Sequence, residues 1–83
     1  MSESTGDVRS LIEQIAKALV DDPGQVAVNT VEEVPETVLE LTVAPNDLGR
    51  IIGKQGRTAR AMRILLGAAG LKFHKHFALE ILE

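Results

Sequence analysis

The sequence predicts an α+β fold with the element order helix, strand, strand, helix, helix, strand. Two patterns support this prediction. Apolar residues recur at helical spacing in some segments and alternate at strand spacing in others. Turn-forming residues separate these segments, and a chain of 83 residues is long enough for one small domain with one modest core.

The first element is expected to be an amphipathic helix over about residues 7–20. Its apolar positions recur at helical spacing: Val8, Leu11, Ile12, Ile15 and Leu19. The run Asp21-Asp22-Pro23-Gly24 ends the pattern, because proline disfavours helical geometry in the residue before it. We expect residues 1–6 to form a flexible N-terminal tail and residues 7–83 to form the single domain.

A hairpin is expected next. Val26 and Val28 alternate with other residues, and a turn is expected around residues 33–36. The run 37–43 then places Leu39, Leu41 and Val43 on one face of a second strand.

Two helices follow the hairpin. Pro45 suits the first turn of a short helix that runs through Asp47 and Leu48 to Ile52. Gly53 is expected to end this helix in a left-handed conformation. After Gly56 a longer helix is expected to close at Gly70. Its apolar positions are Ala59, Met62, Leu65, Leu66 and Ala69.

The last element is expected to be a strand over about residues 74–82. Phe77, Leu79 and Ile81 would lie on one face of it, and His76, Ala78 and Glu80 on the other.

Charge is strongly segregated along the chain. The formal net charge is -3, yet residues 48–79 contain seven basic residues and no acidic one, while residues 1–47 contain ten acidic and two basic residues. Because salt screens charges beyond a Debye length of about 8–10 Å, the local charge decides what a surface binds. A solvated helix face is the ordinary explanation of such a run. Whether this run instead binds an anionic partner depends on its position in the fold.

The stretch 49–63, GRIIGKQGRTARAMR, contains five of these basic residues. Within it, Gly53-Lys54-Gln55-Gly56 is expected to connect the two helices. Two glycines three apart are a weak motif alone, and Gly67-Ala68-Ala69-Gly70 is a second instance. We assign the second instance to helix termination, because it lies at an apolar helix end with no charge between its glycines.

The first instance has the features of a phosphate site. Glycines lack Cβ atoms, so a sugar-phosphate strand can approach the backbone, and free N–H groups at the start of the next helix favour an anion. Lys54 adds a mobile positive charge. Arg57, Arg60 and Arg63 recur every three residues along one side of that helix, and Arg57 and Arg60 could contact the next phosphates.

The stretch 51–62 resembles the signature of the KH (K-homology) domain, which is an apolar pair, a Gly-x-x-Gly loop and a helix. The strand, helix, helix, strand core would span about residues 37–82, with the extra helix and strand before it. This is the type II order, and the whole chain is similar to the small stand-alone bacterial KH proteins of the KhpA type. The resemblance implies a three-stranded mixed sheet packed against three helices. Many KH domains carry a large aliphatic residue where this chain has Ala59, so the groove floor is expected to be shallow.

The resemblance also implies a function, which is non-catalytic binding of single-stranded RNA by an RNA chaperone or post-transcriptional regulator. KH domains hold about four nucleotides, with the loop on the backbone and the bases in an aliphatic groove. That groove would be lined by Ile51 or Ile52 together with aliphatic residues of the second strand. The implied RNA-binding residues are Arg50, Ile51, Ile52, Gly53, Lys54, Gln55, Gly56, Arg57 and Arg60. With about three phosphates contacted, the logarithm of affinity should fall with the logarithm of salt concentration at a slope near −2.

The implied partners are a second copy of the chain and a larger KH-containing protein. Joining two weak sites raises avidity without improving either site. The acidic half of the chain is a candidate for such protein contacts, because it would repel RNA.

Two non-enzymatic alternatives remain open. The two-helix unit could be a helix-turn-helix that reads duplex DNA, or the KH fold could serve protein interaction alone. A low aromatic content of 2% argues against sheets that stack bases on aromatic rings.

Other function classes are disfavoured. Gly49 precedes Gly53 by one position too few for a Walker loop, and Gln55 replaces the magnesium-binding hydroxyl. His74 and His76 are read as surface residues beside Lys75, so we expect no metal site and no cofactor. No catalytic constellation is suggested by spacing, so no enzyme and no small-molecule substrate are expected. The chain has no cysteine, no long apolar run and no secretory signal, which favours a cytoplasmic protein without a membrane segment.

Overall fold

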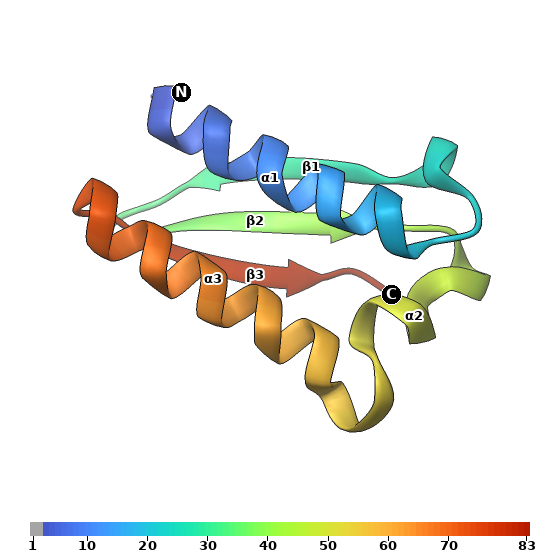
Figure 1. Ribbon diagram of the computed structural model, residues 1–83. Helices are drawn as coiled ribbons and strands as arrows, with labels where there is room; N and C mark the ends of the chain where they lie inside the picture. Colours follow the sequence, from blue (N-terminus) through green and yellow to red (C-terminus); the bar gives the residue numbers. More distant parts are fainter. Residues whose placement is uncertain (1–2) are drawn as a thin grey trace.

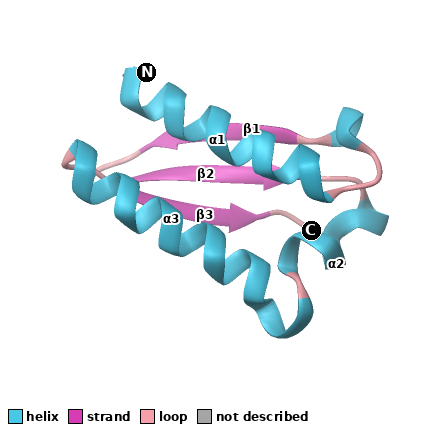
Figure 2. Ribbon diagram, viewed as in Figure 1, coloured by secondary structure: helices cyan, strands magenta, loops and turns pink. Residues whose placement is uncertain are grey.

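The computed structural model describes residues 3–83, and it confirms the predicted fold class and element order. Three helices pack on one face of a three-stranded mixed sheet (Figure 1). The elements are α1 (Glu3–Leu19), β1 (Ala27–Glu32), β2 (Glu36–Thr42), α2 (Leu48–Ile52), α3 (Arg57–Phe73) and β3 (His76–Ile81). Short 3-10 turns precede β1, α2 and α3, and the opposite face of the sheet carries no helix in the described chain (Figure 2).

The sheet has the strand order β1-β2-β3. β1 and β2 are antiparallel and form the predicted hairpin, whose turn is closed by the Glu33 N–H donating to the Glu36 carbonyl oxygen at 2.9 Å. β3 pairs with β2 in the parallel direction, with Leu39 opposite Leu79. Parallel strands need a long crossover, and here α2 and α3 supply it. β3 is therefore an edge strand with α3 beside it.

The core lies between the helices and the sheet. Leu39 and Leu41 of β2 are fully buried, as the predicted alternation requires. The buried apolar residues are Val8, Ile12, Ala16, Val28, Leu39, Leu41, Val43, Ile51, Ala59, Met62, Leu66 and Leu79. On α1 and α3 the buried positions follow helical spacing, so the amphipathic patterns of the sequence explain how both helices dock.

The helix α1 begins at Glu3, earlier than predicted. Thr5 is fully buried, and its side-chain oxygen accepts a hydrogen bond from Lys75 Nζ at 2.9 Å. Residues 3–6, expected in the tail, are therefore part of the helix, while residues 1–2 lie outside the described residues. The first turn contains no large apolar residue, so hydrophobic periodicity could not detect it. The hydrogen-bond partner of Thr5 is a lysine that lies far away in the sequence.

Asp47 links the segment after α1 to the start of α2. Its carboxylate is 2% exposed and accepts the backbone N–H groups of Asp21 and Asp22 at 3.0 and 3.1 Å. The side chain does not cap α2 itself. Because one carboxylate satisfies two donors from a segment far away in sequence, it fixes the end of α1 beside α2.

The C-terminal end of α3 differs from the prediction. The helix continues past Gly70 to Phe73, and His74 follows in the left-handed region at φ 56°. The Lys75 N–H donates to the Gly70 carbonyl at 2.9 Å, which is the bond that closes a helix ending in a left-handed residue. His74 is therefore a helix cap, and β3 begins at His76 rather than at residue 74.

Gly70 is required for close packing and does not end the helix. A Cβ atom there would lie 2.4 Å from the Lys75 carbonyl oxygen. Leu65 is a second correction, because it is 46% exposed rather than part of the buried face. The buried face of α3 is formed by Ala59, Met62, Leu66 and Gly70.

We predict that Asp47→Ala lowers the free energy of unfolding by about 2 kcal/mol, because two partly buried N–H groups lose a charged acceptor. Urea denaturation followed by circular dichroism measures the change. Asp22→Ala is the matched control and should stay within about 0.5 kcal/mol of the parent. Equal losses in the two variants would contradict the assigned role of Asp47.

We predict opposite effects for alanine at two helical glycines. Gly67→Ala should stabilise the protein by about 0.5–1 kcal/mol, because alanine is the better helix former, and nothing lies within 4 Å of the added Cβ. Gly70→Ala should destabilise it by about 1–3 kcal/mol, because the steric conflict exceeds the gain in propensity. Thermal unfolding of both variants tests the pair, and stabilisation by both would refute the packing role of Gly70.

Candidate nucleic-acid interface

The loop Gly53-Lys54-Gln55-Gly56 joins α2 to α3 and projects beyond the end of the sheet (Figure 1). Gly53 has φ 78° and ψ 168°. Its φ is positive, as expected, but its extended ψ turns the chain away from α2. A Cβ at Gly53 would lie 2.3 Å from the Thr58 hydroxyl oxygen. Both the dihedral angles and the close approach of α3 therefore require glycine here.

Two further residues of the loop have positive φ angles. Gln55 has φ 58° and Gly56 has φ 73°. A non-glycine residue in this region costs roughly 1–2 kcal/mol, and such strain is concentrated at functional sites. The Gln55 side-chain oxygen accepts a hydrogen bond from Arg57 Nη2 at 3.3 Å. Gln55 thus orients Arg57, the first arginine of α3.

The cationic side chains around the loop are open to solvent. Lys54, Arg57 and Arg60 are exposed. Within residues 3–83, no acidic side chain forms an ion pair with any of these three or with Arg63. Their charge is therefore available to an external anion.

Arg50 differs from the other arginines of this segment. Its guanidinium lies 3.1 Å from an Asp21 carboxylate oxygen and 3.8 Å from Asp47 Oδ1. Exposed pairs of this kind contribute about 0–1 kcal/mol. Arg50 therefore has internal partners, although the pair with Asp21 is weak enough to exchange.

A hollow of about 620 Å³ runs from the loop along α3 and the edge strand β3. Its apolar residues are Ile52, Ala59, Leu79 and Ile81. Ile51, the other expected residue of the apolar pair, is fully buried in the core and cannot line a groove. The aliphatic strand residues of the hollow come from β3 and not from the second strand of the chain, β2, whose Leu39 and Leu41 are fully buried in the core.

Charged residues of both signs line the same hollow. Arg60 and Arg63 lie on α3, whereas Glu80 and Glu83 lie on β3 and just after it. Arg63 Nη2 also donates to the Leu79 carbonyl at 3.4 Å and so connects the two walls. The RNA-binding residues predicted from the sequence do not include Arg63, the β3 residues or Glu83. Only the parallel pairing of β3 places this strand beside α3.

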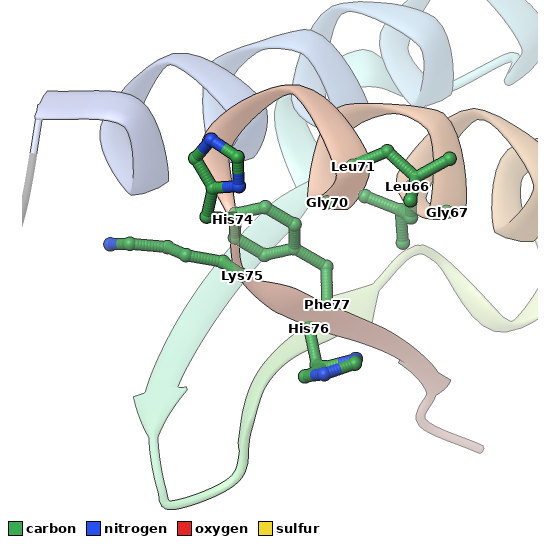
Figure 3. A pocket seen from close by; sticks show the side chains of 8 residues that line it. All are labelled: Leu66, Gly67, Gly70, Leu71, His74, Lys75, His76 and Phe77. Atoms are coloured by element: carbon green, nitrogen blue, oxygen red, sulfur yellow. The ribbon is translucent and has the colours of Figure 1, made fainter.

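A second hollow of about 350 Å³ lies at the opposite end of α3 (Figure 3). His74, Lys75 and His76 surround it together with Leu71 and Phe77. Since His74 caps the helix, the two histidines do not share a strand face. In the described part of the chain, no group of three potential metal ligands comes together.

Across residues 3–83, no helix has both the length and the hydropathy that a bilayer-spanning segment needs.

Comparison with known proteins supports the resemblance. A family model described as "KhpA/KhpB, KH domain" matches residues 9–81. RNA-binding protein KhpA of Caldanaerobacter subterraneus is 50% identical over 72 residues, which cover 87% of this chain and 96% of that protein. RNA-binding protein KhpA of Borreliella burgdorferi is 47% identical over 78 residues, covering 94% of this chain and 95% of that protein.

A solved structure is similar in fold. An Era variant of Aquifex aeolicus bound to GDP.AlF4- superposes with a TM-score of 0.62 at 22% identity, and the match covers 89% of this chain and 29% of that chain. At this identity the likeness concerns the fold alone. A helix and a strand precede the strand, helix, helix, strand core, which is the type II order. On the family match, the two relatives and this element order, the chain belongs to the KhpA/KhpB family of KH-domain proteins.

Proposed function

We propose that this protein is a non-catalytic single-stranded RNA-binding protein that acts as an RNA chaperone or post-transcriptional regulator. One observation carries the proposal. A glycine loop whose surrounding cations Lys54, Arg57 and Arg60 form no ion pair within residues 3–83 lies directly beside an apolar hollow. Both named relatives are RNA-binding proteins, which supports the same conclusion and gives no reason to expect an enzyme.

In the proposed complex the loop clamps the RNA backbone. Gly53 and Gly56 present no side chain to the strand, so phosphates approach the main chain closely. Lys54 supplies a mobile charge at the tip. The helix α3 starts without a side-chain cap, so the partial positive charge of its first turn faces the same strand. Arg57 then takes the next phosphate, held in place by Gln55.

The bases would occupy the hollow between α3 and β3. Its floor is aliphatic, formed by Ile52, Ala59, Leu79 and Ile81. Apolar contact with base faces needs no aromatic ring, which suits a chain with two phenylalanines and neither tryptophan nor tyrosine. Ala59 contributes only a methyl group to this floor, and Arg60 lies at the wall where a phosphate can meet it. We assign Arg50 a peripheral contact, made by exchanging Asp21 for a phosphate.

We further propose that the protein forms homodimers and also pairs with a larger KH-containing protein in the cytoplasm. The helix α3 offers a surface for such contacts. Ile64 is 66% exposed, Leu65 46% and Leu71 83%, and these are large apolar side chains without cover. This surface is more apolar than the acidic half of the chain and leaves the loop free. Two linked sites would compensate for a small contact on each copy.

One prediction tests the clamp. The double variant Lys54→Asp with Gln55→Asp should lose at least about 10-fold in affinity for a single-stranded RNA 10-mer, because phosphates meet two carboxylates in place of one cation. Fluorescence anisotropy and in-cell crosslinking measure the loss. Gln14→Asp with Lys17→Asp on exposed positions of α1 makes the same change in charge and residue type, and should leave affinity within about 2-fold.

Two results would redirect the assignment. Unchanged crosslinking by a folded double variant would favour a protein-interaction module. Tighter binding of duplex DNA than of single-stranded RNA at equal salt would favour a helix-turn-helix function.

Another prediction tests the dimer. Ile64→Glu with Leu71→Glu should convert the dimer to a monomer, because two carboxylates would be buried without partners. Light scattering after size-exclusion chromatography measures the mass. Leu11→Glu, at a 45% exposed leucine of α1, is the control and should remain dimeric. A parent protein that is monomeric at every concentration would refute the homodimer while leaving the clamp untouched.

A further inference from the structure

The groove contains carboxylates that simple phosphate binding does not explain. Arg60 and Arg63 lie on one wall of the hollow, and Glu80 and Glu83 on the other. In the described residues, no ion pair joins an arginine of one wall to a glutamate of the other. Charges of opposite sign thus face one cavity without neutralising each other, so each wall is left to interact with a ligand.

A carboxylate in an RNA groove repels phosphates. Any favourable contribution that it makes to RNA binding must therefore come from contact with another part of the nucleotide. An ionised carboxylate only accepts hydrogen bonds. Among the bases, cytosine offers an N4 amino group at the position where uracil has its O4 carbonyl oxygen, adenine offers N6 and guanine N2. The single donor of uracil, its N3–H, lies between two carbonyl oxygens that repel a carboxylate. A carboxylate therefore favours an amino base and repels the O4 edge of uracil.

We infer that Glu80 is a specificity-determining residue of this groove and selects bases that carry an exocyclic amino group over uracil. The inference rests on the proposed RNA-binding function and adds a ligand class to it. The arginine wall receives the phosphates and the glutamate wall receives the base edges, so the two walls together also set the orientation of the strand.

The position of Glu80 on the strand supports this role. It alternates with Leu79 and Ile81, which form part of the apolar floor, so its side chain leaves β3 on the other face of the sheet and lines the hollow from the open edge of this edge strand. A base lying on that floor has its polar edge next to the strand. Glu80 is exposed, so its side chain has room to follow the base.

The neighbouring strand supplies a matched control. Glu40 of β2 is the register partner of Glu80, and by strand alternation it lies on the same sheet face. Glu40 does not line the hollow. Glu40→Gln and Glu80→Gln remove the same charge from adjacent strands, but only the second changes the groove.

The test compares two pyrimidine 10-mers, oligo-rC and oligo-rU, which differ at the base edge and are closely matched in size. Affinities are measured by fluorescence anisotropy at one salt concentration. The parent should bind oligo-rC at least about 5-fold more tightly than oligo-rU. In Glu80→Gln this ratio should fall below about 2-fold, with affinity for oligo-rU held or raised, because repulsion is removed while cytosine loses its charged acceptor.

Glu40→Gln should change both affinities by the same factor and keep the parent ratio. A parent ratio below about 2-fold, or a Glu80→Gln ratio equal to that of the parent, overturns the inference while RNA binding itself stands. Failure of the folded parent to bind either RNA would instead reject the proposed function.

Discussion

The close approach of α3 to β3 is the constraint on which the rest of the site depends. At the far end of the helix, Gly70 lets the backbone of the following turn come within a distance that any side chain would prevent. Nearer the loop, the Arg63 guanidinium donates to the Leu79 carbonyl and links the same two elements again. These two contacts hold the edge strand along the helix, so the space left between them is a groove with defined walls. Without this packing, the glycine loop would be a cationic turn with no apolar surface beside it.

The same packing also separates the basic and acidic segments of the chain in space. The basic residues of 54–63 remain unpaired in the described structure, while several acidic residues of the first half pair within their own helix or with Arg50. Asp47 has a different role from these ion-paired residues, because its buried carboxylate accepts hydrogen bonds from two backbone N–H groups. The net acidity of the chain therefore gives little information about the surface around the loop.

Local patterns in the sequence predicted the order of the elements, the hairpin, the faces of β2 and β3, and the position of the glycine loop. Features that depend on contacts between distant residues could not be predicted in this way. Periodicity could not decide which of Ile51 and Ile52 faces the core, since both are apolar neighbours at a helix end. The packing role of Gly70 depends on the position of the Lys75 carbonyl group. The early start of α1 depends on the hydrogen bond between Thr5 and Lys75, which are 70 residues apart. The acidic wall of the groove follows from strand pairing, which charge counts along the chain do not reveal.

The left-handed conformation of Gln55 is one that persists only where the surrounding structure fixes it. Because the fold fixes the bend, most of the ordering that binding requires falls on the nucleic acid, whose flexible single strand must give up its own freedom. A strand whose bases are already splayed by its own secondary structure, as in a hairpin loop, would lose less entropy than an unstructured one. The rigidity of this turn therefore gives the protein a thermodynamic reason to discriminate between RNAs by their prior shape, independently of the bases they carry.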